Sequence, residues 1–186
     1  MYDIVSDIKY LATIHGFRFV PAAGVDWQGN FDHGKQPLLS IHGATADAEQ
    51  LDVWAKQYRN CNWLFVPGSG QAVLDVDPRH GGDVLLRELE AKHGALPITV
   101  KSRTGGGGSH FLFACDNALS LKANLCGNDG LTLACGGKAG FVVPPCPHKS
   151  GNRYAWEVSP DMMRPAEAPA WLVALAKPNA PCGRSA

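Results

Sequence analysis

The sequence predicts an α+β domain in which a mixed or antiparallel sheet is flanked by helices. Segments with apolar residues at helical spacing come early in the chain, and a run of short apolar segments separated by glycine-rich turns follows them. Hydrophobic residues make up 45% of the 186 residues and charged residues 18%, so the chain can form the core of one domain. We expect this domain at residues 1–176, followed by a disordered or linker-like tail at 177–186.

The helices are predicted from apolar periodicity and from the residues that begin and end them. Gly16 and Gly94 each follow an amphipathic segment, as glycines that end helices do. Thr45 precedes an acidic first turn and is a candidate N-cap. Helices are therefore expected at 2–15, 45–58, 82–93 and 170–176.

The strands are predicted from short apolar runs bounded by turn residues. Two of these runs, 62–67 and 72–77, flank Gly68-Ser69-Gly70, which is typical of a β-hairpin with a tight glycine turn. Strands are expected at 17–21, 62–67, 72–77, 98–101, 110–114, 131–134, 141–143 and 154–158.

A pair of carboxylates in the strand Val73-Leu74-Asp75-Val76-Asp77 is the most informative chemical feature. Side chains alternate between the faces of a strand, so Asp75 and Asp77 point the same way. Two neighbouring carboxylates repel each other unless a cation lies between them, and hard oxygen ligands suit Mg²⁺ or Mn²⁺. The sequence thus predicts a metal site at Asp75 and Asp77. Taken alone, the pattern also fits a solvent-facing strand end that runs into an Asp-Pro turn.

A glycine-rich segment, Thr104-Gly105-Gly106-Gly107-Gly108-Ser109, leads into His110 and an apolar strand. Successive glycines let backbone N–H groups approach an anion closely, as phosphate-binding loops do. His110 lies where the loop becomes a strand, and it could donate to a phosphate oxygen. A flexible glycine hairpin with an incidental histidine is the alternative. The predicted nucleotide-binding residues of this region are Lys101, Arg103, Gly107, Gly108 and Ser109.

The overall charge argues mildly against tight, autonomous DNA binding, but not against an active site that meets DNA weakly or relies on a fused partner domain to hold it. The formal net charge is zero, whereas phosphate neutralisation by basic residues supplies most non-specific affinity for DNA. No apolar run approaches the ~20 residues of a membrane-spanning helix, and no secretory signal is recognisable, so we expect a cytoplasmic protein.

At these residues the sequence resembles the bifunctional DNA primase/polymerase N-terminal domain of the archaeo-eukaryotic primase superfamily, whose fold is related to the RNA-recognition motif. Leu74-Asp75-Val76-Asp77 matches the family's first motif, and Gly108-Ser109-His110 matches the end of its second. Gly34-Lys35-Gln36-Pro37 and Phe141-Val142-Val143-Pro144-Pro145 resemble further family elements. The likeness covers roughly residues 10 to 175.

The third motif departs from the family pattern. The family places another Asp on a strand shortly before the Phe141 segment, and Thr132 stands at that position here. Asp129 lies three positions earlier and could replace the missing carboxylate only if the loop bends, because an odd shift puts it on the opposite face of a regular strand. The loss of one carboxylate is expected to weaken catalysis.

The resemblance implies a metal-dependent nucleotidyltransferase, a DNA primase/polymerase module of a plasmid, phage or mobile-element replication protein. It implies Mg²⁺ or Mn²⁺ at Asp75 and Asp77, with Asp129 as a possible third ligand, and His110 as a catalytic residue. The implied partners are nucleoside triphosphates, a single-stranded DNA template or primer, and a fused or separate helicase domain. The basic cluster expected at the nucleotide, with a surface hairpin as the alternative, is His148, Lys149 and Arg153.

Two other functions use the same residues. The chain could be a catalytically weakened nucleotide- or DNA-binding module that lacks the third carboxylate. It could also be a nuclease or phosphohydrolase that uses the same two aspartates, because a fold does not fix a reaction.

Overall fold

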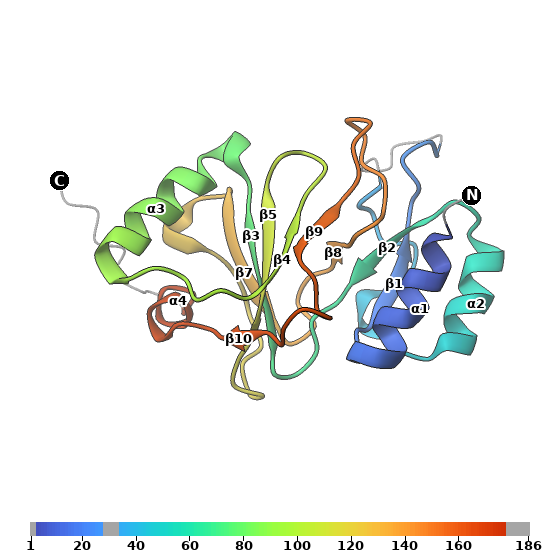
Figure 1. Ribbon diagram of the computed structural model, residues 1–186, viewed down its shortest axis with the longest axis horizontal. Coiled ribbons are helices and arrows are strands. Elements are labelled where there is room, and N and C mark those ends of the chain that lie inside the picture. Colours follow the sequence, from blue (N-terminus) through green and yellow to red (C-terminus); the bar gives the residue numbers. More distant parts are fainter. Residues whose placement is uncertain (1–2, 28–33, 178–186) are drawn as a thin grey trace.

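The computed structural model describes residues 3–27 and 34–177, so the predicted tail lies outside the described residues except for Lys177. Its elements form four layers, in the order helices, large sheet, small sheet, helices (Figure 1). The sheets are antiparallel apart from one parallel strand pair, which confirms the predicted α+β class with a mixed sheet.

The small sheet has the strand order β1-β2-β8 and is antiparallel. Helices α1 (Ile4–His15) and α2 (Ala48–Gln57) cover its outer face (Figure 1). Its inner face shares a core with Val73, Val100 and Leu112 of the large sheet. Every residue of its strands is therefore buried; these strands are β1 (Phe19–Ala22), β2 (Asn62–Phe65) and β8 (Phe141–Val142).

The large sheet has the strand order β6-β7-β3-β5-β4-β9, and β10 pairs with β5 in parallel. Helices α3 (Gly82–His93) and α4 (Ala170–Leu175) cover the face that points away from the small sheet (Figure 1). In chain order the strands are β3 (Gln71–Val76), β4 (Val100–Arg103), β5 (Ser109–Ala114), β6 (Lys122–Asn124), β7 (Leu131–Cys135), β9 (Ala155–Val158) and β10 (Ala166–Glu167). Three short 3-10 helices lie among the described residues, at Ile41–Gly43, Pro78–His80 and Leu125–Gly127.

The alternation of side chains along β3 explains how this strand serves both faces of the large sheet. Ala72, Leu74 and Val76 pack into the core beneath α3 and α4. Val73 packs into the core between the sheets, and Asp75, two residues further on, faces the same side. The predicted opposition of Asp75 to Leu74 and Val76 is therefore confirmed.

The hairpin predicted across Gly68-Ser69-Gly70 is wrong. β2 pairs with β1 and β8 in the small sheet, whereas β3 pairs with β5 and β7 in the large sheet. The connecting segment is bonded to other parts of the chain, since the Gly70 carbonyl accepts from Cys115 N and the Pro67 carbonyl accepts from Gly137 N. A glycine turn between two apolar strands can join two sheets as well as two neighbouring strands.

Several element boundaries differ from the prediction; β3, for example, ends at Val76, before Asp77. Thr45 does not cap α2; Asp47 does, because its side chain accepts a bond from Glu49 N at 2.9 Å, while Thr45 pairs with Phe19. The strand expected at 98–101 begins at Val100, and Ile98 is 77% exposed. The short strands β6 and β10 were not predicted.

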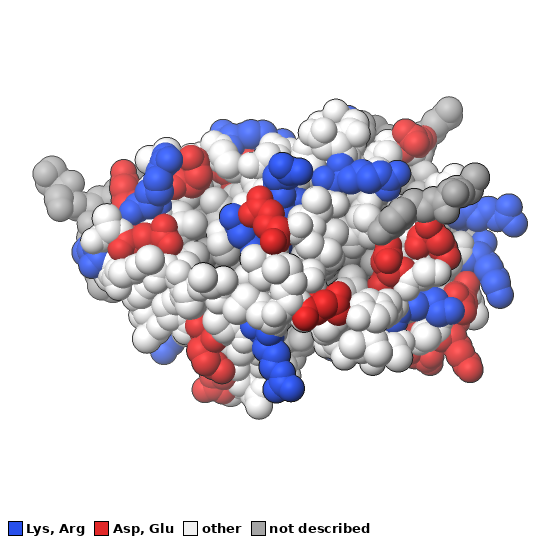
Figure 2. Space-filling model, viewed as in Figure 1, with Lys and Arg blue, Asp and Glu red and all other residues white. Residues whose placement is uncertain are grey.

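Charged side chains of both signs are interspersed on the face shown in Figure 2, without a continuous basic surface. This distribution agrees with the net charge of zero. In the described part of the chain, no helix has the length and apolar character that crossing a membrane requires.

Candidate functional site

Asp75, His110 and Thr132 lie side by side on three neighbouring strands. In the register of the large sheet, Asp75 of β3 is opposite His110 of β5 on one side and opposite Thr132 of β7 on the other. The Nε2 atom of His110 lies 3.6 Å from Oδ1 of Asp75. Two segments that are 35 residues apart in the sequence, at positions 75 and 110, thus meet as the motif pattern predicted.

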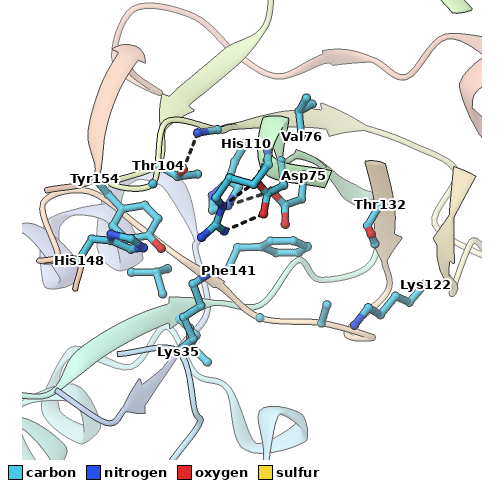
Figure 3. A pocket seen from close by; sticks show the side chains of 18 residues that line it. Lys35, Asp75, Val76, Thr104, His110, Lys122, Thr132, Phe141, His148 and Tyr154 are labelled. Atoms are coloured by element: carbon cyan, nitrogen blue, oxygen red, sulfur yellow. Dashed lines mark hydrogen bonds and ion pairs between the residues drawn. The ribbon is translucent and has the colours of Figure 1, made fainter. Parts of the chain in front are cut away.

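These side chains face a cavity between the two sheets, here called the inter-sheet cavity (Figure 3). Strand β8 contributes Phe141 from the small sheet, and the loops at 104–108 and 147–154 close one side. Both predicted metal ligands, Asp75 and Asp77, line it, together with His110 and His148.

Asp77 has its own cationic partner. It caps the 3-10 helix at Pro78–His80 by accepting a bond from Arg79 N at 3.0 Å. The guanidinium of Arg79 holds both carboxylate oxygens, at 3.0 and 2.7 Å. These side-chain bonds are the main reason why the pKa of Asp77 is lowered. The cation expected beside this aspartate is therefore supplied by the chain itself.

The glycine loop is a tight turn between β4 and β5. Gly107 N donates to the Thr104 carbonyl, and Gly108 N donates to the Thr104 hydroxyl at 2.9 Å. Gly107 has φ +90, a backbone conformation that residues with a side chain rarely adopt. The two amides predicted to cradle a phosphate are thus used within the loop. Its glycines instead allow close packing, since a Cβ at Gly105 would collide with the His148 side chain.

Lys101, Arg103 and Ser109 do not line the inter-sheet cavity. Lys101 is opposite Phe111, lies 5.0 Å from the centre of its ring, and pairs with Glu157 at 2.7 Å. Phe111 packs against the core beneath α3 and α4, so Lys101 is on the face away from His110. Arg103 is opposite Ser109, two positions further along the same face.

The basic cluster at 148–153 is divided between two places. His148 is 6% exposed and reaches the inter-sheet cavity, where its Nδ1 lies 3.0 Å from the Ser150 hydroxyl. Lys149 and Arg153 are exposed and line a second cavity, which His148 also lines, and they do not line the inter-sheet cavity. Burial, followed by the charges of Lys35, Arg79 and Lys149, lowers the pKa of His148.

Asp129 does not take the place of the missing third carboxylate. Its Oδ1 accepts a bond from the Asn124 side chain at 2.6 Å, and Asn124 in turn accepts the Thr132 hydroxyl at 2.8 Å. Thr132 lines the inter-sheet cavity and Asp129 does not. The side chain opposite Asp75 is therefore the Thr132 hydroxyl, which two successive hydrogen bonds through Asn124 connect to Asp129.

Besides Arg79, two cationic residues that line the cavity were not predicted to bind. Lys35 comes from the segment before α2, and Lys122 comes from β6 at the edge of the large sheet. Figure 3 shows them on opposite margins of the cavity, with Phe141 between them. Lys35 belongs to the Gly34–Pro37 element of the family resemblance, which was a signal for it; Lys122 lies in a strand that periodicity did not reveal.

The residues of the cavity suit a divalent cation that takes some of its ligands from phosphate. They do not suit a cation that is held by three or more side chains of the protein. Within residues 3–27 and 34–177, no three His, Cys, Asp or Glu side chains are grouped so that they could hold a metal ion. Mg²⁺ is commonly held by one or two carboxylates together with phosphate oxygens. Asp75 and Asp77 could serve one such ion, provided that Arg79 releases Asp77. A site with three carboxylates would be incomplete here, because Thr132 occupies the position of the third.

The largely enclosed His110, whose side chain is 13% exposed, predicts a pH dependence of stability. Burial is the main cause that lowers its pKa, Lys35 adds to this, and Asp75 opposes it. Just below the ordinary pKa of about 6.5, the unfolded chain binds a proton that the folded chain refuses, so stability falls as the pH falls. Between pH 7.5 and 5.5, in a chelating buffer, the free energy of unfolding measured in urea should fall less for His110→Gln than for the wild type. The expected difference is up to about 1.4 kcal/mol per pH unit.

The control for this measurement is His42→Gln, because His42 is exposed and lies outside the inter-sheet cavity. This variant should keep the wild-type pH response. An equal pH response in His110→Gln would mean that the neutral form of His110 is not what the fold requires.

The two sheets thus enclose a cavity with neighbouring carboxylates, a histidine that is 13% exposed and several cations, within an α+β domain. The chain belongs to the bifunctional DNA primase/polymerase N-terminal family, whose model matches residues 8–171. This membership suggests a nucleotidyltransferase module of the DNA primase/polymerase type. A comparison with curated proteins found no match.

Proposed function

We propose that the chain binds a nucleoside triphosphate in the inter-sheet cavity and acts as a metal-dependent nucleotidyltransferase in DNA priming or polymerisation. The observation that carries the proposal is the convergence of Asp75, Asp77 and His110 at one cavity in a chain of this family. The same cavity offers Lys35 and Arg79 to the charge of a triphosphate. A site of this kind lowers a reaction barrier mainly by positioning and by electrostatics.

The chain's own residues have distinct tasks in this proposal. Lys35 and Arg79 bind and orient phosphate oxygens, and Arg79 exchanges its bonds to Asp77 for bonds to phosphate. His110, neutral because of its burial, donates a hydrogen bond to a phosphate oxygen. Asp75 and Asp77 would hold a Mg²⁺ or Mn²⁺ ion, which offsets negative charge as a primer 3′-hydroxyl displaces pyrophosphate.

The proposed macromolecular partner is a single-stranded DNA template with its primer, with a helicase domain, fused or separate, in a mobile-element replication protein. Lys149 and Arg153 are exposed beside the cavity and are suited to contact the backbone of a strand that enters it. The mixed charge of the face in Figure 2 favours a local contact over a broad basic surface.

A second function is favoured by one specific observation: Thr132 stands opposite Asp75 where the family pattern has an acid. A cavity with a hydroxyl there, and with Asp77 held by Arg79, could bind a nucleotide without transferring it. The two functions differ in their products, since the binding module would retain the triphosphate intact.

The experiment that tests the proposal uses a primed single-stranded DNA template, labelled nucleoside triphosphates and Mg²⁺ or Mn²⁺. Template-dependent elongation of the primer is the expected result. Binding of the triphosphates without elongation would support the binding module instead. Shortened strands would indicate a nuclease, and the absence of both binding and elongation would contradict the proposal.

A further inference from the structure

The inter-sheet cavity carries an excess of positive charge. Among the described residues that line it, the cations are Lys35, Arg79 and Lys122, and the carboxylates are Asp75 and Asp77. Three positive charges against two negative ones leave an excess of one. A cavity with an excess of carboxylates would need a metal ion to attract an anion, whereas this cavity already carries a net positive charge.

The two lysines of the cavity lack carboxylate partners in the described part of the chain. The ion pair of Arg79 with Asp77 offsets the charge of both groups, and among the described residues the ion-pair neighbour of Asp75 is His110, at 3.6 Å, which carries a charge only when it is protonated. Neither Lys35 nor Lys122 is within 4.0 Å of a described carboxylate. Both lysines are exposed at the cavity, so their ammonium groups are accessible to an anion that lies between them.

Lys122 is placed beside the position where the third acid is missing. The register pairs Asn124 with Thr132 and Lys122 with Ala134, so Lys122 and Asn124 point to the same face of the sheet. Asn124 holds the Thr132 hydroxyl, and Lys122 extends next to it toward the cavity (Figure 3). An acid at position 132 would attract this ammonium group, whereas a hydroxyl leaves it available to an external anion.

We infer that the inter-sheet cavity binds a polyphosphate chain directly, without a divalent cation, and that Lys122 is a polyphosphate-binding residue opposite Lys35. This inference rests on the proposed function, because the polyphosphate is the tail of the nucleoside triphosphate. It goes beyond that function in separating two steps: binding needs only the lysines and Arg79, and a metal ion is needed only for transfer. Ammonium and guanidinium groups bind phosphate oxygens through charge-assisted hydrogen bonds.

The test measures the binding of ATP, dATP and inorganic tripolyphosphate to the whole chain by calorimetry, once in EDTA and once in MgCl₂. We expect the nucleotides and tripolyphosphate to bind in EDTA, and Mg²⁺ to tighten nucleotide binding by no more than about twofold. The Lys122→Met variant should weaken binding in EDTA about tenfold, the loss expected for a hydrogen bond to a charged group. The matched control is Lys92→Met on α3, which removes a charge from an exposed site outside the cavity and should change nothing.

A second variant tests the role of the missing acid. Thr132→Asp should weaken binding in EDTA by a factor similar to that of Lys122→Met and should make binding depend on Mg²⁺, because it removes the positive excess. Thermal unfolding of each variant checks that the fold is retained. An unchanged affinity of Lys122→Met in EDTA would overturn the inference.

The outcomes separate this inference from the function on which it rests. Nucleotide binding that occurs only with Mg²⁺ would refute the direct recognition and leave the proposed function standing. Nucleotide binding in EDTA without tripolyphosphate binding would also refute it, since the contacts would then lie on the nucleoside. No nucleotide binding in either buffer would contradict the proposed function itself.

Discussion

An Asp75→Asn variant is expected to lose primer elongation by at least about a hundredfold. Loss of a residue that only supports a metal ligand costs up to about a hundredfold, and loss of a ligand itself should cost at least as much. The substitution keeps the size of the side chain and removes its charge. The side chain of Asp75 is 38% exposed, and no arginine or lysine among residues 3–27 and 34–177 forms an ion pair with it. The ion pair that it forms among the described residues is the 3.6 Å approach to His110, so the variant should unfold at nearly the wild-type temperature.

The matched control is Asp129→Asn, which makes the same chemical change on the acid that the sequence offered as a third ligand. Asp129 bonds Asn124 and does not reach the cavity, so elongation should stay within about twofold of the wild type. A large loss in this control would mean that the loop at 128–130 moves Asp129 into the site. Full elongation by Asp75→Asn would mean that transfer does not use the inter-sheet cavity.

The same variant separates binding from transfer. Removing the charge of Asp75 increases the positive excess of the cavity, so Asp75→Asn should bind ATP in EDTA more tightly than the wild type does. Elongation and metal-free binding are thus expected to change in opposite directions. Weaker binding in EDTA together with lost elongation would indicate damage to the cavity as a whole.

The part of the site that could be predicted from the sequence follows from strand periodicity. Alternation alone placed Asp75 opposite Leu74 and Val76, and the structure agrees. The same rule, applied across the tight turn at 104–108, excludes Lys101 and Arg103 from the site. Ser102 is opposite His110, and the residues on either side of it point to the other face. Proximity to the glycine loop in the sequence was a weaker guide than the period of the strand.

The sheet arrangement could not be predicted, because it depends on partners that are distant in the sequence. Gly68-Ser69-Gly70 specifies a turn, but the turn does not determine which strands lie beside β2 and β3. β2 is buried on both faces between α1, α2 and the large sheet, and its pairing with β8 joins residues 64 and 142. The cavity exists because the two strands belong to different sheets, so this error concealed the origin of the site.

Lys122 shows a second limit of sequence-based prediction. β6 has three residues, of which Lys122 and Asn124 are exposed, so it lacks the apolar alternation by which strands are recognised. It is a strand because β7 offers it an edge, which is a property of the assembled sheet. A basic residue in such a strand can be assigned to a site only once the register is known.

Gly130→Ala is expected to destabilise the fold by about 3 kcal/mol, which corresponds to a loss of roughly 10 °C in unfolding temperature. A Cβ at this position would lie 2.7 Å from the Asp77 carbonyl oxygen, 2.7 Å from Gly82 N and 2.8 Å from the His80 carbonyl oxygen. All three neighbours are backbone atoms, which cannot rotate away as a flexible side chain can. The loop before β7 must therefore move.

That movement would reach the site, because the Gly130 carbonyl accepts a bond from Asp77 N at 2.7 Å. This bond and the one from Gly82 N to the Asp77 carbonyl, at 3.0 Å, fix the end of β3 and the direction of the Asp77 carboxylate. The control is Gly43→Ala, where a Cβ meets no atom within 4 Å and φ is not positive, so its unfolding temperature should stay near that of the wild type. Equal unfolding temperatures for the two variants would mean that the loop at 128–130 yields freely. In that case Asp77 would be positioned by Arg79 alone, and Arg79→Ala, rather than Gly130→Ala, would be the variant that displaces it.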